Sequence, residues 1–376
     1  MKQFLFIALA IALAACSSGG ASDVEDYSAT IYAPEYATGF TITGDTACGN
    51  VMITTTRPWQ NCDSSDVRRL VVLAPGSEAA APAGVPAVQA PVRRVVALST
   101  THIGLLDAFG ADSVVVGVSG TDYVSNPKVK ARLDSDADVG YEGNIDYERL
   151  LALRPDVVLL YGVNGPSGME DKLDELSIPY IYIGDYTEES PLGKAEWMVP
   201  LGYLVGGADQ ARVAMEGIAE RYLELRDQVS LLSRCPTVML NTPYNDTWFM
   251  PSMQSYFVQL LQDAGAIYIY PSNDSGGSVS VDMETAYLLA DRADYWLNTG
   301  AASTMAQLEQ AVPRFMDVPS VRAGRVYNSV KRMSPSGAND YFESGAAAPD
   351  RVLADLVSIF HPGVRSDSLY YYLRLQ

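Results

Sequence analysis

Histidine is scarce in this sequence: its 376 residues contain only His102 and His361. The four cysteines form no Cys-x-x-Cys pair, and there is no Asp-x-Asp-x-Asp-Gly loop of the calcium-binding type. Because protein zinc sites are built mostly from three or four His and Cys ligands, these absences exclude a site of that kind. We therefore expect neither a resident metal nor a resident cofactor.

Positive charge is also in short supply. Lys and Arg number 26 against 45 Asp and Glu, which gives a formal net charge of −19. Since such a surface repels the phosphates of nucleic acids, we expect no nucleic-acid partner. An anionic ligand can be bound only where nearby cations overcome this field.

Common catalytic motifs are missing too. The sequence has no Gly-x-Ser-x-Gly, no Gly-x-x-x-x-Gly-Lys-Ser/Thr and no His-Glu-x-x-His. The glycine-rich segment 162–168 contains Pro166, which lacks the amide that a phosphate loop needs. These absences favour a binding protein over an enzyme. An enzyme and a surface adhesion module are the alternatives from other functional classes.

The chain begins with the pattern of an exported lipoprotein. Lys2 precedes an apolar run from Phe4 to Ala12, which is shorter than the roughly 20 residues of a membrane-spanning helix. Small residues then lead to Cys16, whose thiol can carry a lipid. We expect a signal peptide over residues 1–15, lipidation of Cys16 and a flexible tether over residues 16–26. Ordinary secretion with a chance cysteine is the alternative.

Lipidation at Cys16 predicts an extracytoplasmic protein anchored to a bacterial membrane, facing the periplasm or the cell surface. In such an oxidising compartment, Cys48 and Cys62 are candidates for a disulfide that closes a short loop. Two reduced cysteines are the alternative. Cys235 precedes an apolar strand pattern and is interpreted as a structural residue.

Changes of pattern divide the remaining chain. Residues 27 to about 75 alternate apolar and polar side chains in short runs, which predicts a small β element, and a linker rich in Pro and Ala extends to residue 90. Strand and helix patterns then alternate, which is typical of parallel sheets flanked by helices. We predict an α/β fold with an N-terminal lobe over 91–190, one long interlobe helix over 191–206 and a C-terminal lobe over 207–376.

The two predicted lobes share an internal echo. The segment from Asp146 to Leu151 leads through Arg154-Pro155-Asp156 into a strand, and the segment from Asp282 to Tyr287 leads through Arg292-Ala293-Asp294 into another. Two generic helix–strand units can match by chance, so the echo by itself is weak evidence of duplication.

Several segments resemble one family, the substrate-binding lipoproteins of ABC importers for iron-siderophore complexes, haem and vitamin B12. They are Arg94 to Ser99, Asp146 to Leu159, and Pro349 to Leu356 before His361-Pro362. Their order and spacing carry the resemblance, which covers about residues 92–363. It implies a bilobed class III periplasmic binding protein, a monomer with a ligand cleft between its lobes, a rigid helix spanning them and limited closure on binding. The partners implied are a small-molecule metal complex and the transmembrane subunits of an ABC permease. The ligand is then an iron chelate or a corrinoid, with haem as the alternative.

Loops at the carboxyl ends of the predicted strands are the expected lining of that cleft, because open parallel sheets bind ligands there. Aromatic side chains suit large planar ligands, although any single tyrosine of the 23 is more often a core or surface residue. For His102 a capping or packing role is the alternative, and Arg57, Lys331 and Arg332 are candidates for pairing with acidic ligand groups. The predicted ligand-binding residues are Ser99, Thr100, His102, Tyr123, Tyr141, Tyr161, Tyr244, Trp248 and Tyr341.

The resemblance also implies that one acidic residue on each lobe docks on arginines of the permease. The residues that match by motif are Glu148 and Glu284, which occupy the same place in the two echoed segments. The alternative is that each glutamate only stabilises the first turn of its helix.

Overall fold

The structure is a computed structural model that describes residues 23–45, 47–141 and 143–376. The predicted signal peptide, the lipidation site Cys16 and the tether as far as residue 22 lie outside the described residues. Residues 24–26, at the end of the predicted tether, form a single 3₁₀ turn that is capped by Asp23. Within the described part of the chain, no helix combines the length and the apolar character needed to cross a bilayer.

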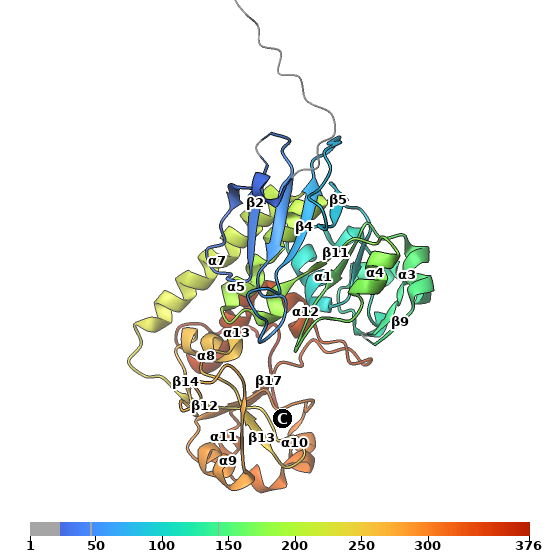
Figure 1. Ribbon diagram of the computed structural model, residues 1–376. Helices are drawn as coiled ribbons and strands as arrows, with labels where there is room; N and C mark the ends of the chain where they lie inside the picture. Colours follow the sequence, from blue (N-terminus) through green and yellow to red (C-terminus); the bar gives the residue numbers. More distant parts are fainter. Residues whose placement is uncertain (1–22, 46, 142) are drawn as a thin grey trace, which may run out of the picture.

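The predicted β element is a five-stranded sheet at the N-terminus (Figure 1, blue). Strands β1 (Ala29–Tyr32), β2 (Phe40–Gly44), β3 (Val51–Thr55) and β4 (Arg68–Leu73) form an antiparallel meander. On β2, Phe40 and Ile42 are buried whereas Thr41 is exposed, as a half-buried strand requires. The predicted linker also contributes structure, because β5 (Ala87–Gln89) pairs in parallel with β4.

The N-terminal lobe has a parallel sheet in the order β11-β10-β6-β7. Its strands are β6 (Val95–Ala97), β7 (Val115–Val118), β10 (Val157–Leu160) and β11 (Tyr180–Tyr182). Helices α1 (Thr100–Asp107), α2 (Pro127–Arg132), α3 (Tyr147–Leu153) and α4 (Glu170–Glu175) connect and flank them. All four residues of β10 are fully buried, which explains why this strand is a continuous apolar run.

The C-terminal lobe repeats this plan. Strands β14 (Ile267–Tyr268), β12 (Thr237–Leu240), β16 (Tyr295–Leu297) and β17 (Val326–Asn328) lie side by side in parallel, and β18 (Leu373–Arg374) adds an antiparallel edge. Helices α8 (Tyr256–Asp263), α9 (Met283–Ala290), α10 (Met305–Ala311) and α11 (Pro319–Arg322) flank the sheet. A separate antiparallel pair joins β13 (Trp248–Met250) to β15 (Val279–Val281).

The lobes share one topology, so the echo in the sequence has a structural counterpart. Numbered along the chain, the four parallel strands of each lobe lie in the order 2-1-3-4. In each lobe an aspartate before the third strand binds the start of the first strand in the same way. Asp156 N donates to Arg94 O at 2.8 Å and its carboxylate accepts from Arg94 N at 2.9 Å; Asp294 makes the corresponding bonds to Thr237, both at 2.9 Å.

The long helix joining the lobes is not the segment predicted. Residues 191–206 form two short helices, α5 (Pro191–Glu196) and α6 (Met198–Val205), with a break at Trp197. Pro200 accounts for the break, because it has no N–H to donate to Glu196 O and its ring would clash with that carbonyl. The long helix is α7 (Ala208–Ser230), whose 23 residues span about 34 Å. It starts after Gly206, in the left-handed conformation that ends α6, and descends from the N-terminal sheet toward the C-terminal lobe (Figure 1).

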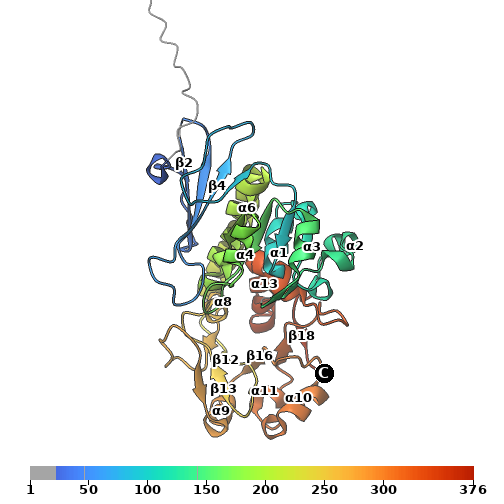
Figure 2. The same ribbon diagram turned by 45° about the vertical axis from the view of Figure 1, so that its right-hand side comes forward.

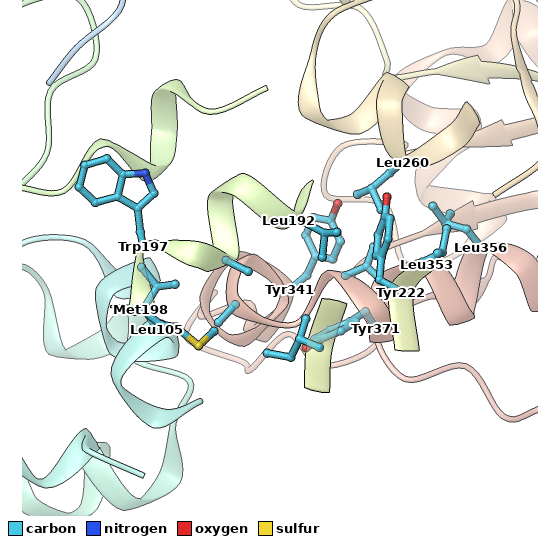
Figure 3. Close-up of a cluster of buried hydrophobic side chains, with 14 of the residues drawn as sticks. Leu105, Leu192, Trp197, Met198, Tyr222, Leu260, Tyr341, Leu353, Leu356 and Tyr371 are labelled. Atoms are coloured by element: carbon cyan, nitrogen blue, oxygen red, sulfur yellow. The ribbon is translucent and has the colours of Figure 1, made fainter. Parts of the chain in front are cut away.

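A continuous hydrophobic core connects the lobes. Helices α12 (Asp340–Ala347) and α13 (Pro349–Phe360) follow the C-terminal sheet in sequence, yet α12 packs on α1 of the N-terminal lobe. Figure 3 shows Leu105 of α1, Leu192 of α5 and Leu260 of α8 in one cluster with side chains of α12 and α13. A Cβ on Gly104 would lie 2.1 Å from Glu343 O, so α1 and α12 approach backbone to backbone. This packing leaves little freedom for a hinge between the lobes.

The candidate disulfide between Cys48 and Cys62 does not form in the structure, where Cys62 is a free thiol; the alternative of reduced cysteines holds. Cys48 lies in the turn before β3 and Cys62 in the loop after it, at opposite ends of a five-residue strand. Such a strand spans about 17 Å, whereas a disulfide needs Cα atoms within about 7 Å.

Two buried carboxylates fix the N-terminal sheet to the N-terminal lobe. Glu196 of α5 accepts hydrogen bonds from the amides of residues 35, 36 and 37 at 2.6–2.8 Å and from Tyr32 Oη at 2.7 Å. Glu188, just before α5, accepts from Thr38 N, Gly39 N at 2.8 Å and Trp197 Nε1 at 3.1 Å. Together they satisfy every backbone amide from residue 35 to 39.

We predict that Glu196→Gln lowers the free energy of unfolding by about 2–4 kcal/mol, because the amide group removes the charge and turns N–H donors toward the N–H groups of residues 35–37. Denaturant unfolding measures the loss, and hydrogen exchange of those amides locates it. The control is Glu216→Gln on the exposed face of α7, expected within about 0.5 kcal/mol of the parent. Equal stability of the two variants would contradict the assigned role.

Candidate functional site

A cavity of about 900 Å³ lies between the lobes. Arg57, Gln60 and Asn61 of the N-terminal sheet line one side, and residues around α5, including Tyr186 and Lys194, line the floor. The C-terminal lobe supplies the remaining walls from the loops after its strands and from α8 and α12. Figure 2 shows the two lobes stacked, with the loop after β3 descending from the sheet toward α8. The volume lies within the usual range for pockets that enclose a small organic ligand.

The lining is rich in neutral polar groups. Asn241 and Asn298 directly follow β12 and β16 and adopt left-handed backbone conformations, with φ of 68° and 58°. Several of the amides are already fixed by the fold; Asn328 Nδ2, for example, donates to Gly300 O and Ala302 O, both at 2.8 Å. The carboxamide residues of the lining are Gln60, Asn61, Asn241, Gln254, Asn298, Asn328 and Asn339, and its aromatic residues are Tyr186, Tyr256, Phe257, Tyr341 and Phe342.

Lys194 places a cation on the floor of the cavity. Its Nζ lies 3.3 Å from Asp185 Oδ2 and donates to Asp185 O at 2.8 Å. The same nitrogen lies 5.7 Å from the ring centre of Tyr256 and 6.0 Å from that of Tyr186, at the distances of cation–π contacts. Since Asp185 is buried, its carboxylate offsets most of the charge that Lys194 presents to the cavity.

His102 does not face the cavity, which corrects the prediction that it contacts the ligand. It is fully buried, with Nε2 3.8 Å from Asp185 Oδ1. Burial lowers the pKa of His102 to about 4; nearby Asp185 raises it, and Lys194 lowers it further. The imidazole is therefore neutral near pH 7 and serves packing, the alternative recognised from the sequence. Its partner lies 83 positions along the chain, too far for sequence patterns to reveal.

Trp248 is the second correction. It is fully buried, with its ring centre 5.0 Å from that of Phe315 and 5.8 Å from that of Trp296, and its Nε1 donates to Leu240 O at 2.8 Å. The residue belongs to β13, which folds back over the lobe rather than forming an open loop. A ligand in the cavity does not reach this indole.

The other predicted ligand-binding residues are scattered. Among the nine, only Tyr341 lines the cavity within the described part of the chain, and Thr101 takes the position expected of Ser99 and Thr100, which cap and begin α1. Tyr123 and Tyr141 pack edge to face on the N-terminal lobe, each about half exposed. Tyr161 packs against a hydrophobic cluster of the N-terminal lobe. Tyr244 is exposed in the turn before β13. Ligand contact by these residues stays a prediction.

The predicted set lacked lining residues from three regions: the loop after β3 of the N-terminal sheet, the segment around α5, and the C-terminal lobe around α8 and after β16 and β17. Arg57 was anticipated only as a cation for acidic ligand groups, and it does line the cavity. Of the other two such cations, Arg332 pairs with Asp340 and lies over the ring of Tyr370, whereas Lys331 Nζ donates to Leu369 O. The loop that contains Arg57 follows a strand with an alternating pattern, and such a pattern does not reveal whether the next loop lines a cavity.

Glu148 and Glu284 occupy equivalent places on the two lobes. Each is exposed in the first turn of its helix, α3 or α9, two residues after the aspartate that caps the helix. Asp146 accepts from Arg149 N at 3.0 Å and Asp282 from Thr285 N at 2.7 Å. The two carboxylates are thus presented to solvent on matching surfaces of the two lobes.

The sequence profile of periplasmic binding proteins matches residues 95–331. The chain belongs to the periplasmic binding protein family. This confirms the predicted membership, and the bilobed fold is that of the solute-binding proteins similar to it.

Individual comparisons agree with this membership. A periplasmic haem-binding protein from Pseudomonas aeruginosa matches with a TM-score of 0.58 and 19% identity, over 76% of this chain and 98% of that one. The siderophore-binding protein of Vibrio cholerae, solved with Fe³⁺-Desferal, matches with a TM-score of 0.53 and 21% identity, over 71% of this chain and 99% of that one. In sequence, an uncharacterized lipoprotein of Methanocaldococcus jannaschii is 25% identical over 289 residues, 73% of this chain; the chain spans 66% of the length of that relative.

A second buried titratable group joins α12 to the N-terminal lobe. The carboxylate of Glu343 accepts from Ser125 N and Asn126 N, both at 2.7 Å. Burial raises the pKa of Glu343 to about 7, although the two amide bonds lower it. Both His102 and Glu343 therefore differ in protonation between the folded and unfolded states in the range from about pH 4 to 7, and their effects on the pH dependence of stability have opposite signs.

We predict that His102→Leu reduces the loss of stability on acidification. Because the folded pKa of about 4 lies below the unfolded value of about 6.5, the unfolded chain takes up the proton first. The contribution of neutral His102 to the free energy of unfolding is therefore fully present above pH 6.5. It falls by up to about 3 kcal/mol as the pH drops toward 4. Neither ring nitrogen has a hydrogen-bond partner, so leucine leaves none unsatisfied. Denaturant unfolding at pH 7 and pH 4.5 measures the difference.

Glu343→Gln provides the control of opposite sign. Its raised folded pKa makes the carboxyl stabilise the fold at low pH, and this contribution is lost as the pH rises from about 4.5 to 7. The variant is therefore expected to show a larger gain of stability with rising pH than the parent. Identical pH profiles for the parent and His102→Leu would refute the assignment.

Proposed function

We propose that the protein is a membrane-anchored, extracytoplasmic lipoprotein that binds an iron-siderophore complex or a corrinoid between its lobes and delivers it to an ABC permease. The single observation that supports this most directly is the cavity of about 900 Å³, to which both lobes contribute. Family membership supports the class of protein, and the siderophore-binding protein of similar fold supports the class of ligand. On this proposal the protein acts as a monomer and without catalysis.

The lining suits a ligand with a polar periphery. Carboxamides and hydroxyls both donate and accept hydrogen bonds, so they match the amides of a corrinoid or the chelating oxygens and amides of a siderophore. Tyrosine and phenylalanine rings offer flat apolar contact beside them. The combination of polar groups fixed by the fold with aromatic surface is typical of sites that orient a small organic ligand.

Haem is the alternative ligand. The haem-binding protein of similar fold supports it, and a tyrosine can serve as an axial ligand to haem iron. Burial raises the pKa of both Tyr256 and Tyr341 well above the ordinary value, however, which opposes the phenolate form that iron binds.

On this proposal the lipid on Cys16 keeps the binding protein at the membrane. A tethered binding protein stays near the membrane that holds its permease, so its effective concentration there exceeds that of a freely diffusing one. Glu148 and Glu284 then offer one carboxylate per lobe, to which permease arginines bind through charge-assisted hydrogen bonds. Docking by both lobes lets the transporter recognise their relative position.

We predict that the soluble form lacking residues 1–20 binds one ferric siderophore, corrinoid or haem molecule per chain, detected by quenching of tryptophan fluorescence. Tyr186→Ala, which removes an aromatic contact in the cavity, is expected to weaken binding about five- to tenfold. Phe249→Ala is the matched control, since Phe249 is an exposed aromatic side chain that does not line the cavity, and should change affinity less than about twofold. If the protein binds none of the three ligand types, the proposed function is wrong.

We predict that Glu148→Lys combined with Glu284→Lys lowers uptake by cells at least about tenfold while the affinity for ligand stays unchanged, because like charges then face the permease arginines. Transport of a labelled ligand and equilibrium binding measure the two effects separately. Glu216→Lys on α7 is the control for a charge reversal elsewhere on the surface. Loss of ligand affinity in the double variant would contradict a docking role.

A further inference from the structure

The N-terminal sheet contributes to the cavity although it lies outside the family match. The profile of the family begins at residue 95, whereas Arg57, Gln60 and Asn61 belong to the loop between β3 and β4. All three side chains are exposed and line the cavity. The site therefore has a third wall that neither α/β lobe supplies.

This loop is held firmly on the N-terminal lobe. Thr187 Oγ1 donates to Arg57 O at 3.0 Å, and Gln60 N donates to Val163 O at 2.9 Å. Between them, Trp59 is buried with its ring edge-on to Tyr182, the centres 5.5 Å apart. A loop fixed in this way loses little conformational entropy when a ligand binds.

Two glycines make the close approach possible. Gly162 follows β10 and Gly184 follows β11; a Cβ on Gly162 would lie 2.9 Å from Pro58 O, and one on Gly184 would lie 2.8 Å from Arg57 O. The loop therefore covers the carboxyl ends of both strands, where a ligand of an open parallel sheet ordinarily binds. For this reason the loop with Arg57, and not Tyr161 directly after β10, lines the cavity.

Two other charged side chains of the lining already have partners within the protein, whereas Arg57 keeps most of its hydrogen-bond donors available. Lys194 is paired with Asp185, and Glu188 is occupied by the amides of Thr38 and Gly39. Arg57 donates one hydrogen bond from Nη1, to Thr38 Oγ1 at 3.1 Å, and forms no ion pair within the described part of the chain. Its guanidinium has five donors, so it retains the capacity for a bidentate contact.

We propose that the loop from Arg57 to Asn61 is a ligand-binding element in which Arg57 binds a carboxylate of the ligand, with Gln60 and Asn61 hydrogen-bonding the atoms beside it. The inference rests on the proposed function and narrows it to ligands that carry a carboxylate. In a protein with a net charge of −19, a cation next to the ligand is what allows such an anion to enter.

The test compares each ligand with a form in which its carboxylates are masked. The matched probes are haem and its dimethyl ester, and cobalamin monocarboxylic acid and cobalamin, titrated into the purified protein. Ferric citrate, which carries carboxylates, and the ferric complex of desferrioxamine, a hydroxamate chelate, are titrated as an unmatched pair of iron chelates. Arg57→Gln is expected to weaken binding of the carboxylate form about ten- to hundredfold and that of its masked counterpart less than about threefold. Arg57→Lys should recover part of the loss, since it restores the charge but not the bidentate geometry.

Arg69→Gln is the matched control, an exposed arginine of the same sheet on β4, and should leave both affinities unchanged. Thermal unfolding verifies that each variant is folded. Equal effects of Arg57→Gln on charged and masked forms, or none on either, would overturn this inference while leaving the proposed function intact. If the parent protein binds none of the probes, the proposed function fails and the inference fails with it.

Discussion

The arrangement of the site depends on two buried carboxylates. Glu188 and Glu196 accept the backbone amides of residues 35–39 and thereby fix the N-terminal sheet on α5. Burying two anions costs free energy, which only a complete set of hydrogen bonds offsets, so the sheet has one well-defined position. That position brings the loop after β3 to the cavity. A β element that looks like an appendage in the sequence is thus an integral part of the N-terminal lobe.

Much of the fold was predictable because the apolar patterns are unambiguous. Strands buried on both faces, such as β10 and β12, require continuous apolar runs, and the strand–helix alternation around them specifies parallel sheets. The break at Trp197 could also have been predicted from the sequence, since Pro200 excludes an unbroken helix. The prediction of one helix over 191–206 did not take that proline into account, although its predicted end coincides with Gly206, which ends α6.

The site was harder to predict, because a cavity is defined by segments distant in sequence. Tyr341 lines the cavity as predicted, yet Trp248 of β13 is buried against Phe315, and His102 of α1 is buried beside Asp185. The rule that ligands bind at the carboxyl ends of parallel strands located the right region. It failed at β10 because the loop carrying Arg57 covers the carboxyl end of that strand, and that loop belongs to a segment without any motif.

The shared strand order of the lobes, with its matching Asp156 and Asp294 contacts, has a consequence for assembly. Two domains of one topology on a single chain present similar surfaces twice, in the manner of a pseudo-dimer. A partner built from two like halves can engage such a molecule with the same surface on each half, just as isologous contacts repeat in a symmetric dimer. The N-terminal sheet is present on one lobe only and breaks this approximate symmetry, so the two orientations of such a complex are not equivalent.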